Sequence, residues 1–152
     1  MKKIIFYFCF FLLFGCSGFE PLFSSKNISY YIADIESVDK NDVTKRISKR
    51  LGNIKKDNTK KGYSLKVSAN MKKIISSKDN KGQVSAYRMI VSANFDVRNN
   101  DSNILIGNIK LDKDFIYDNQ KNKFELKKYE KIIQENLIDK ILQEINIRLH
   151  TL

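Results

Sequence analysis

The spacing of hydrophobic and polar residues changes several times along the chain, and each change marks an expected element. In the middle of the chain the two kinds alternate, which is typical of strands with one buried face. Three strands are predicted, around 63–71, 87–97 and 104–117. Polar residues at 76–82 and 99–101 should join them as turns of an antiparallel meander. The buried face is expected to carry Tyr63, Leu65, Val67, Ala69, Met71, Tyr87, Met89, Val91, Ala93, Phe95, Val97, Leu105, Gly107, Ile109, Leu111, Phe115 and Tyr117.

Two other stretches repeat their apolar residues every three or four positions, which predicts helices. The first should begin at Asp39 as N-cap, with Val38 and Val43 forming a hydrophobic staple, and Gly52 should end it or weaken its last turn. Its buried stripe is predicted to be Val43, Ile47, Leu51 and Ile54. The second covers 124–149, and its stripe is broad enough to contact both a sheet and a neighbouring helix. That stripe contains Leu126, Tyr129, Ile132, Ile133, Leu137, Ile138, Ile141, Leu142, Ile145 and Leu149.

A further strand is expected at 28–36, where β-branched and aromatic residues gather ahead of the first helix. The predicted order is therefore βαβββα. Two amphipathic helices and a sheet with one apolar face are accommodated by a two-layer α+β sandwich. We expect both helices to pack on one face of a four-stranded, mostly antiparallel sheet.

The N-terminus has the pattern of a signal peptide. Lys2 and Lys3 precede an apolar run at 4–14, which is shorter than the roughly 20 residues that a membrane-spanning helix needs. The run ends in Leu-Phe-Gly-Cys, a lipobox-like sequence in which Cys16 would follow the cleavage site. We expect residues 1–15 to be a lipoprotein signal peptide, and Cys16 to carry a diacylglycerol and an N-acyl chain. The alternative is an ordinary buried cysteine near the N-terminus.

Downstream of the leader the chain divides into two parts. Residues 16–27 contain Gly, Pro and Ser and are expected to form the lipidated N-terminus and an extended tether. Residues 28–152 are long enough for one domain with a real core. Because Cys9 lies in the leader and Cys16 would be acylated, no cysteine remains for a disulfide, a thiol nucleophile or a zinc site.

The chain is strongly basic, with 28 Lys and Arg against 17 Asp and Glu and a formal net charge of +11. Loss of the two leader lysines would leave 26 basic against 17 acidic side chains, a net charge of +9. Such an excess suggests nucleic acid or an anionic membrane surface. Export excludes nucleic acid, which leaves anionic lipid headgroups, lipid phosphates or an acidic protein. The alternative is a compositional bias, since the lysines are spread along the chain.

The sequence argues against an enzyme, and no cofactor other than the acyl chains is expected. The single histidine, His150, is third from the C-terminus and is expected to be a surface residue. Asp112 and Asp114 lie on one strand face, but they are expected on its polar side beside Lys110 and Lys113. No nucleophile arrangement, metal-ligand cluster or glycine-rich phosphate loop is evident in the sequence.

Three stretches resemble one known family. Cys16 followed by Gly-Phe-Glu-Pro-Leu-Phe at 18–23 is similar to the start of the LPS-assembly lipoproteins of Gram-negative bacteria, the LptE family. Residues 85–94 resemble the central strand of that family, and 145–149 resemble the end of its long C-terminal helix. The inserted Ser17 departs from the commonest form of the first motif.

The resemblance implies a lipid-anchored outer-membrane lipoprotein on the periplasmic side. Such a protein would plug and support a β-barrel translocon, an LptD-like partner, and would assist lipopolysaccharide assembly. Arg and Lys suit lipid phosphates because they donate charge-assisted hydrogen bonds. The candidate contacts to lipopolysaccharide or the partner are Lys66, Lys72, Lys78, Lys81 and Arg88. For each of these the alternative is a solvated or barrel-lining side chain, and for the whole protein it is another periplasm-facing binding module or envelope scaffold.

Overall fold

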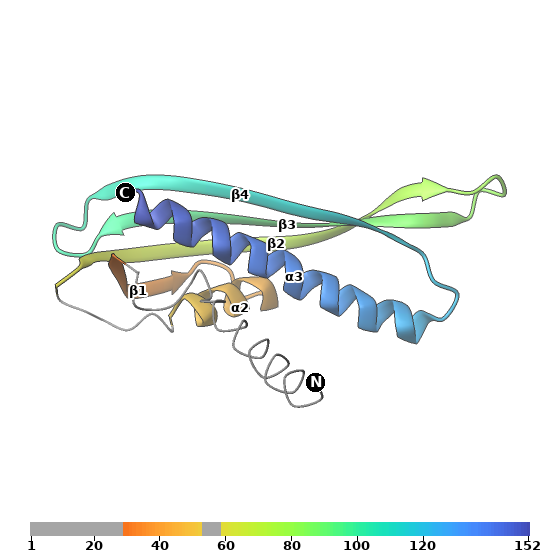
Figure 1. Cartoon of the computed structure of the whole chain (residues 1–152), viewed down its shortest axis with the longest axis horizontal. Coiled ribbons are helices and arrows are strands. Elements are labelled where there is room, and N and C mark those ends of the chain that lie inside the picture. The colour runs from red at the N-terminus through yellow and green to blue at the C-terminus, as the bar shows by residue number, and fades with distance from the viewer. Residues whose placement is uncertain (1–28, 53–58) are drawn as a thin grey trace, which may run out of the picture.

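The computed structural model describes residues 29–52 and 59–152 and confirms the predicted order of elements (Figure 1). The elements are β1 (Tyr30–Ser37), α2 (Asp42–Leu51), β2 (Lys61–Lys78), β3 (Val84–Asn99), β4 (Leu105–Asp118) and α3 (Lys123–His150). The predicted leader and tether, and the predicted stripe residue Ile54, lie outside the described residues.

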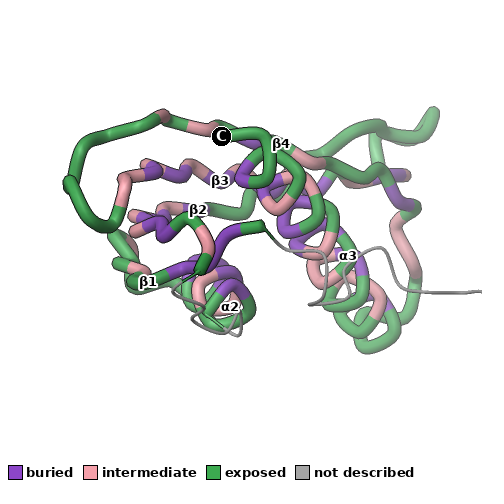
Figure 2. The backbone as a smooth tube through the Cα atoms, turned by 60° about the vertical axis from the view of Figure 1, so that its left-hand side comes forward, coloured by how far each residue is buried: buried purple, intermediate pink, exposed green. Residues whose placement is uncertain are grey.

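The four strands form one sheet in the order β1-β2-β3-β4. β1 is parallel to β2, whereas β2, β3 and β4 are antiparallel neighbours, as the predicted meander requires. Both helices lie on the same face of the sheet, α2 over β1 and β2 and α3 over β3 and β4 (Figure 2). The expected two-layer α+β sandwich is thus confirmed.

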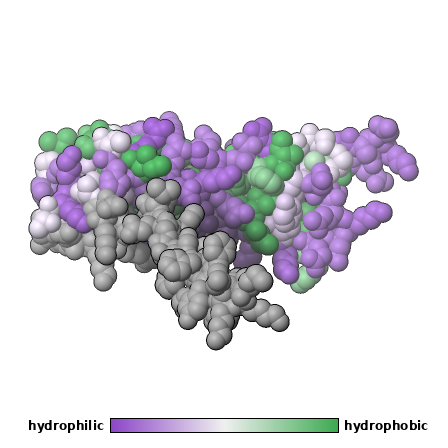
Figure 3. Space-filling model, viewed as in Figure 1, coloured by the Kyte–Doolittle hydropathy of each residue, from purple (hydrophilic) through white to green (hydrophobic). Residues whose placement is uncertain are grey.

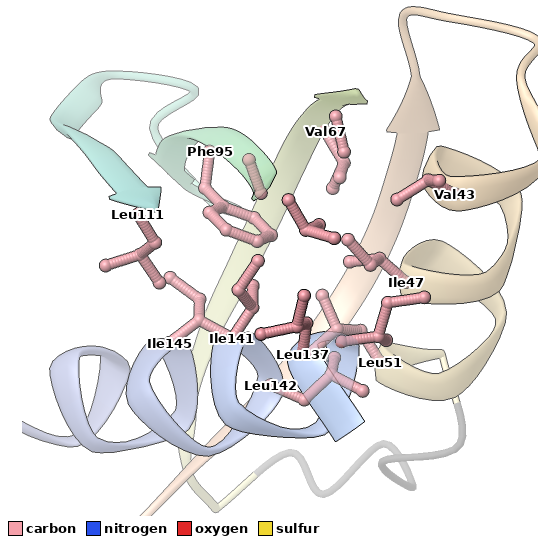
Figure 4. Packing of buried hydrophobic residues seen from close by; sticks show 14 of the residues in the cluster. Val43, Ile47, Leu51, Val67, Phe95, Leu111, Leu137, Ile141, Leu142 and Ile145 are labelled. Carbon is pink, nitrogen blue, oxygen red and sulfur yellow. The ribbon is translucent and has the colours of Figure 1, made fainter. Parts of the chain in front are cut away.

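The core lies between the sheet and the two helices. Val67 of β2 and Phe95 of β3 are fully buried and point toward α2 and α3 (Figure 4). Ile47 meets them from α2, and Ile141 from α3. The odd-numbered residues of β2 and β3 face the helices over the length that the helices cover, so the predicted register of these strands is confirmed.

The start of α2 differs from the prediction. Its N-cap is Asn41, whose side-chain oxygen accepts the Thr44 N–H at 2.9 Å, and not Asp39. The predicted staple is also wrong, because Val38 is 58% exposed. Its N–H is bonded to the Val67 C=O at 2.9 Å, which continues the pairing of β1 with β2 to the residue directly before the expected N-cap. Gly52 ends the helix as predicted, and its N–H bonds to the Ser48 C=O.

The β2–β3 hairpin is longer than predicted. β2 continues to Lys78, which pairs with Val84, so the turn is shorter than the predicted 76–82. The Asp79 side chain accepts the N–H groups of Lys81 and Gln83, and Gly82 has a φ of 76° that favours glycine. These local bonds allow the strands to pair almost to the tip.

Several side chains assigned to the buried set are largely exposed. Met71, Leu105, Phe115 and Ile132 are 40–50% exposed. The strands are longer than the helices that cover them, and Figure 1 shows the β2–β3 hairpin extending past α2 and α3. Alternation therefore predicted the face of Met71 and Phe115 correctly but not how far the cover reaches. The predicted face of Leu105 is wrong, because a register shift in β4 pairs it with Arg98 of the opposite face.

The register can be tested on β3. Val91 is fully buried, so Val91→Asp would place an uncompensated charge in the core and should cost several kcal/mol, comparable with the stability of the whole domain. Ser92→Asp is the matched control because Ser92 points to the other face. Circular dichroism melting of the unlipidated chain should show loss of the Val91→Asp fold only. Unfolding by Ser92→Asp alone would mean that the register is wrong by one residue.

A second test concerns Thr44, the one polar residue that is fully buried in the described part of the chain. Its hydroxyl accepts the Ala69 N–H at 3.0 Å and donates to the Ala69 C=O at 3.1 Å. Thr44→Val keeps the shape but removes both bonds, and it should cost about 1–3 kcal/mol in the free energy of unfolding. Thr44→Ser keeps the hydroxyl and should cost less. Urea denaturation measures both, and a less stable Ser variant would contradict this account.

Candidate functional site

The candidate site is the sheet face that α2 and α3 leave uncovered, together with the hairpin tip. We define the polar face as the even-numbered residues of β2 (64–74), β3 (88–98) and β4 (108–116), which the register places on one side. Its middle is polar because Ser, Asn, Asp and Lys occupy most positions. Two buried polar atoms on this face, Asn94 Oδ1 and Arg98 Nε, have no hydrogen-bond partner in the described structure.

The five predicted contact residues do not form one cluster. Lys66 and Lys78 are twelve residues apart on one strand, which corresponds to about 40 Å. Lys66 lies on the polar face near β1, and its Nζ pairs with Glu36 at 2.8 Å. Lys72 lies further along the same face, opposite Ile90, and is exposed. Lys66 is therefore separate from the other candidates, which lie along the projecting hairpin.

Arg88 is already engaged in an ion pair. Its Nε donates to Asp114 Oδ2 across the β3–β4 ladder at 2.8 Å. The hydrogen bond lowers the pKa of Asp114 below its usual range, and the same bond raises the pKa of Arg88. Asp112 and Asp114 are on the polar face as predicted, and Asp114 pairs there with Arg88. A phosphate at Arg88 would therefore meet a charge that is already neutralised.

The hairpin tip is the most accessible basic feature. Lys78 ends β2 and Lys81 lies in the turn, and both are exposed. Asp79 is the single acidic residue between the ends of β2 and β3, and it is bonded to backbone N–H groups of the turn. The projecting end of the molecule is hydrophilic in Figure 3. The tip can therefore offer two lysines to an anionic group.

Sequence reasoning missed two lysines on the helix-covered side of the sheet. Lys73 pairs with Glu130 of α3, and its Nζ lies 3.8 Å from the centre of the Tyr87 ring. Tyr117 also donates to Glu130, at 2.9 Å. Lys113, which we expected on the polar side, pairs with Glu144 of α3 instead. The signal was present, since alternation places both lysines on the apolar face.

Two groups in these contacts, Glu144 and Tyr117, have pKa values shifted by their surroundings. Hydrogen bonds from Lys113 and Arg148 hold the pKa of Glu144 below its usual range. Burial, with the bond to Glu130, raises the pKa of the Tyr117 hydroxyl. At neutral pH Glu144 therefore stays ionised as an acceptor for Lys113, and Tyr117 stays protonated as a donor to Glu130.

His150 contacts the start of β1. Its ring hydrogen-bonds Ser29 Oγ at 2.9 Å and lies edge-on to Tyr30, with ring centres 5.3 Å apart. It is exposed, as predicted. Within residues 29–52 and 59–152 no three His, Cys, Asp or Glu side chains are grouped to hold a metal ion. Over the same residues no helix is both long and apolar enough to cross a membrane.

Comparison with known structures supports the fold. A minor lipoprotein from Acinetobacter baumannii is 16% identical with a TM-score of 0.58, covering 82% of this chain and 92% of that one. Rare lipoprotein B from Shewanella oneidensis is 18% identical with a TM-score of 0.53, covering 76% and 92%. Lipoprotein B from Nitrosomonas europaea is 12% identical with a TM-score of 0.56, covering 85% and 88%. At these identities the likeness concerns the fold.

Comparison at the level of sequence gives the family. No curated protein matches the chain significantly. The family model described as "LptE: Lipopolysaccharide-assembly" matches residues 24–149, which include every described helix and strand except the last residue of α3. The chain therefore belongs to the LptE family of lipopolysaccharide-assembly proteins.

Proposed function

We propose that this protein is a lipid-anchored lipoprotein of the outer membrane that faces the periplasm, plugs and supports a β-barrel translocon, and assists lipopolysaccharide assembly. The observation that carries the proposal is the family match over residues 24–149. The role is one of binding and support, and no catalytic step is assigned to any residue.

The proposed anchor is Cys16, acylated after removal of residues 1–15. Residues 16–27 would then connect the lipid to the domain. Twelve residues span at most about 40 Å when fully extended. Two or more acyl chains suffice for stable attachment, because each buried methylene contributes roughly 0.8 kcal/mol. The domain would therefore stay within one tether length of the membrane.

The shape and chemistry of the sheet support a place inside a polar lumen. β2 alone has 18 residues, which corresponds to about 60 Å of strand. The polar face offers hydrogen-bonding groups along much of this length, including the unpartnered Asn94 Oδ1 and Arg98 Nε. A polar barrel wall could supply the missing partners without burying apolar surface. The helices pack on the opposite side of the sheet and leave this face uncovered.

Contact with lipopolysaccharide would use the hairpin. Lys72, Lys78 and Lys81 are exposed there, and their ammonium groups suit the phosphates of lipid A. Lys66 and Arg88 are weaker candidates, because each already pairs with a carboxylate of the sheet. Extraction in mild detergent, followed by identification of what co-purifies, tests the whole proposal. A large barrel is expected, and its absence would favour a scaffold or another binding module.

The anchor gives one prediction. Cys16→Ser should abolish acylation and release the protein from membranes while its melting temperature stays unchanged, because Cys16 precedes the predicted domain at 28–152. Mass spectrometry of the mature wild-type protein should show cleavage before Cys16 and the added acyl mass. Retention of residues 1–15, or an unmodified Cys16, would refute the lipoprotein assignment.

The hairpin tip gives a second prediction about function. Lys78→Glu with Lys81→Glu should weaken association with the barrel or with lipopolysaccharide, while stability stays within about 0.5 kcal/mol of wild type, as is usual for exposed positions. The matched control is Lys45→Glu with Lys49→Glu, which makes the same charge change on the exposed side of α2. Co-purification yield and binding to lipopolysaccharide are the measurements. Equal losses in both double variants would indicate a general charge effect rather than a contact at the tip.

A further inference from the structure

The backbone of β2 has two edges, and its polar groups alternate between them. The C=O of Gly62 accepts the Asn100 N–H beside β3, so this even-numbered residue faces β3. The C=O of Val67 accepts the Val38 N–H, and Ala69 bonds to Thr44, so these odd-numbered residues face β1 and α2. Because N–H and C=O of one strand residue point to the same side, the N–H and C=O of Met71 and Lys73 also point away from β3.

This edge is closed only as far as Ala69. β1 pairs with β2 up to Val67, where Ser37 is its partner. At Ala69 two side chains at the start of α2 replace the missing strand. The Thr44 hydroxyl bonds both backbone groups, and Nδ2 of the N-cap Asn41 donates to the C=O at 2.7 Å. Side chains at the start of α2 therefore take the place of a neighbouring strand at Ala69.

Beyond Ala69 the edge is open. We define the open edge as residues 70–75 of β2, and all six are exposed. No strand or capping side chain of the described structure pairs with the outward backbone groups of Met71 and Lys73. The pairing with β3 remains regular as far as Ile75, where bulges begin. The segment is therefore a regular strand with one free edge, which is a template for another strand.

The charges on this edge select the kind of strand that fits. Lys72 and Lys73 lie within it and Lys78 follows it, and no acidic residue occurs between Asn70 and Lys78. Two copies joined along this edge would bring lysines face to face, and like charges directly opposite are destabilising. An incoming strand with carboxylates at alternate positions would present them on the polar face, where Lys72 is exposed and has no acidic partner in the described structure. Apolar residues at the other positions would lie on the opposite face beside Met71, where Lys73 already pairs with Glu130.

We propose that the open edge of β2 binds an extended acidic strand of a partner protein by β-augmentation. The backbone groups of Met71 and Lys73 form the ladder, and the exposed Lys72 provides the selectivity for acidic residues. The inference rests on the geometry of this strand and does not depend on the identity of a barrel partner.

The test uses the purified full chain in mild detergent and a short synthetic peptide of alternating glutamate and valine, with a lysine–valine peptide as its charge control. The acidic peptide should bind and slow hydrogen exchange at the Met71 and Lys73 amides, measured by NMR. The Asn70 and Lys72 amides, which already face β3, should change little. The lysine–valine peptide should not bind. Absence of binding by the acidic peptide, or equal binding of both peptides, would overturn the proposal.

A backbone variant separates the edge from its side chains. Met71→Pro removes only an N–H that faces the open edge, so it should weaken peptide binding about tenfold, the value of one hydrogen bond. Met71→Ala removes the side chain, keeps the N–H and should bind within about threefold of wild type. If Met71→Pro does not fold, the amide exchange of the wild-type chain decides. Unaltered binding by a folded Met71→Pro variant, or dimerisation through this edge, would refute the acidic-strand assignment.

Discussion

The burial of one face of β3 beneath α3 is the constraint on which the other features depend. β3 is paired on both sides, and Val91, Phe95 and Val97 are completely buried. Side chains alternate along a strand, so burial of these three determines which residues of β2 and β4 face the helices and which face outward. Slipping by one residue would exchange a core of aliphatic and aromatic side chains for one of Ser, Asn and Asp. The polar face is a direct consequence of the packing on its other side.

The second constraint is the mismatch in length between the sheet and its cover. At two strand positions that face the helices, a lysine stands in place of an apolar residue. Lys73 of β2 pairs with Glu130 of α3, and Lys113 of β4 pairs with Glu144 of α3. Near Lys73 the Tyr87 and Tyr117 rings pack together with Tyr129 of α3. These mixed contacts join the helix to the root of the hairpin. Beyond them, residues 74–83 of the hairpin are exposed in the described structure, so they are available to a partner.

The sequence predicted the fold better than it predicted the site. Alternation over β3 and the long stripe of α3 sufficed for the element order and the layer arrangement, because both patterns report burial directly. The N-cap at Asn41 was missed because Asp39, Asn41 and Asp42 are all acceptable caps, and the choice depends on how far β1 pairs with β2. The separation of the five basic candidates and the engagement of Arg88 with Asp114 depend on cross-strand register. The residue pattern within one strand does not determine which residues of the neighbouring strand lie opposite it.

The start of β1, which follows the proposed tether, is held by contacts with the C-terminal end of the chain. Tyr30 is almost fully buried at the start of β1, and its hydroxyl donates to Asn146 of α3 at 2.7 Å. Burial raises the pKa of that hydroxyl, so it remains a donor at any physiological pH. His150 covers the Tyr30 ring, and Lys61 donates to the backbone of Leu152. The start of β1 is thus tied to the last helix as well as to β2, and a pull from the proposed N-terminal tether would act on the core rather than on one edge strand alone.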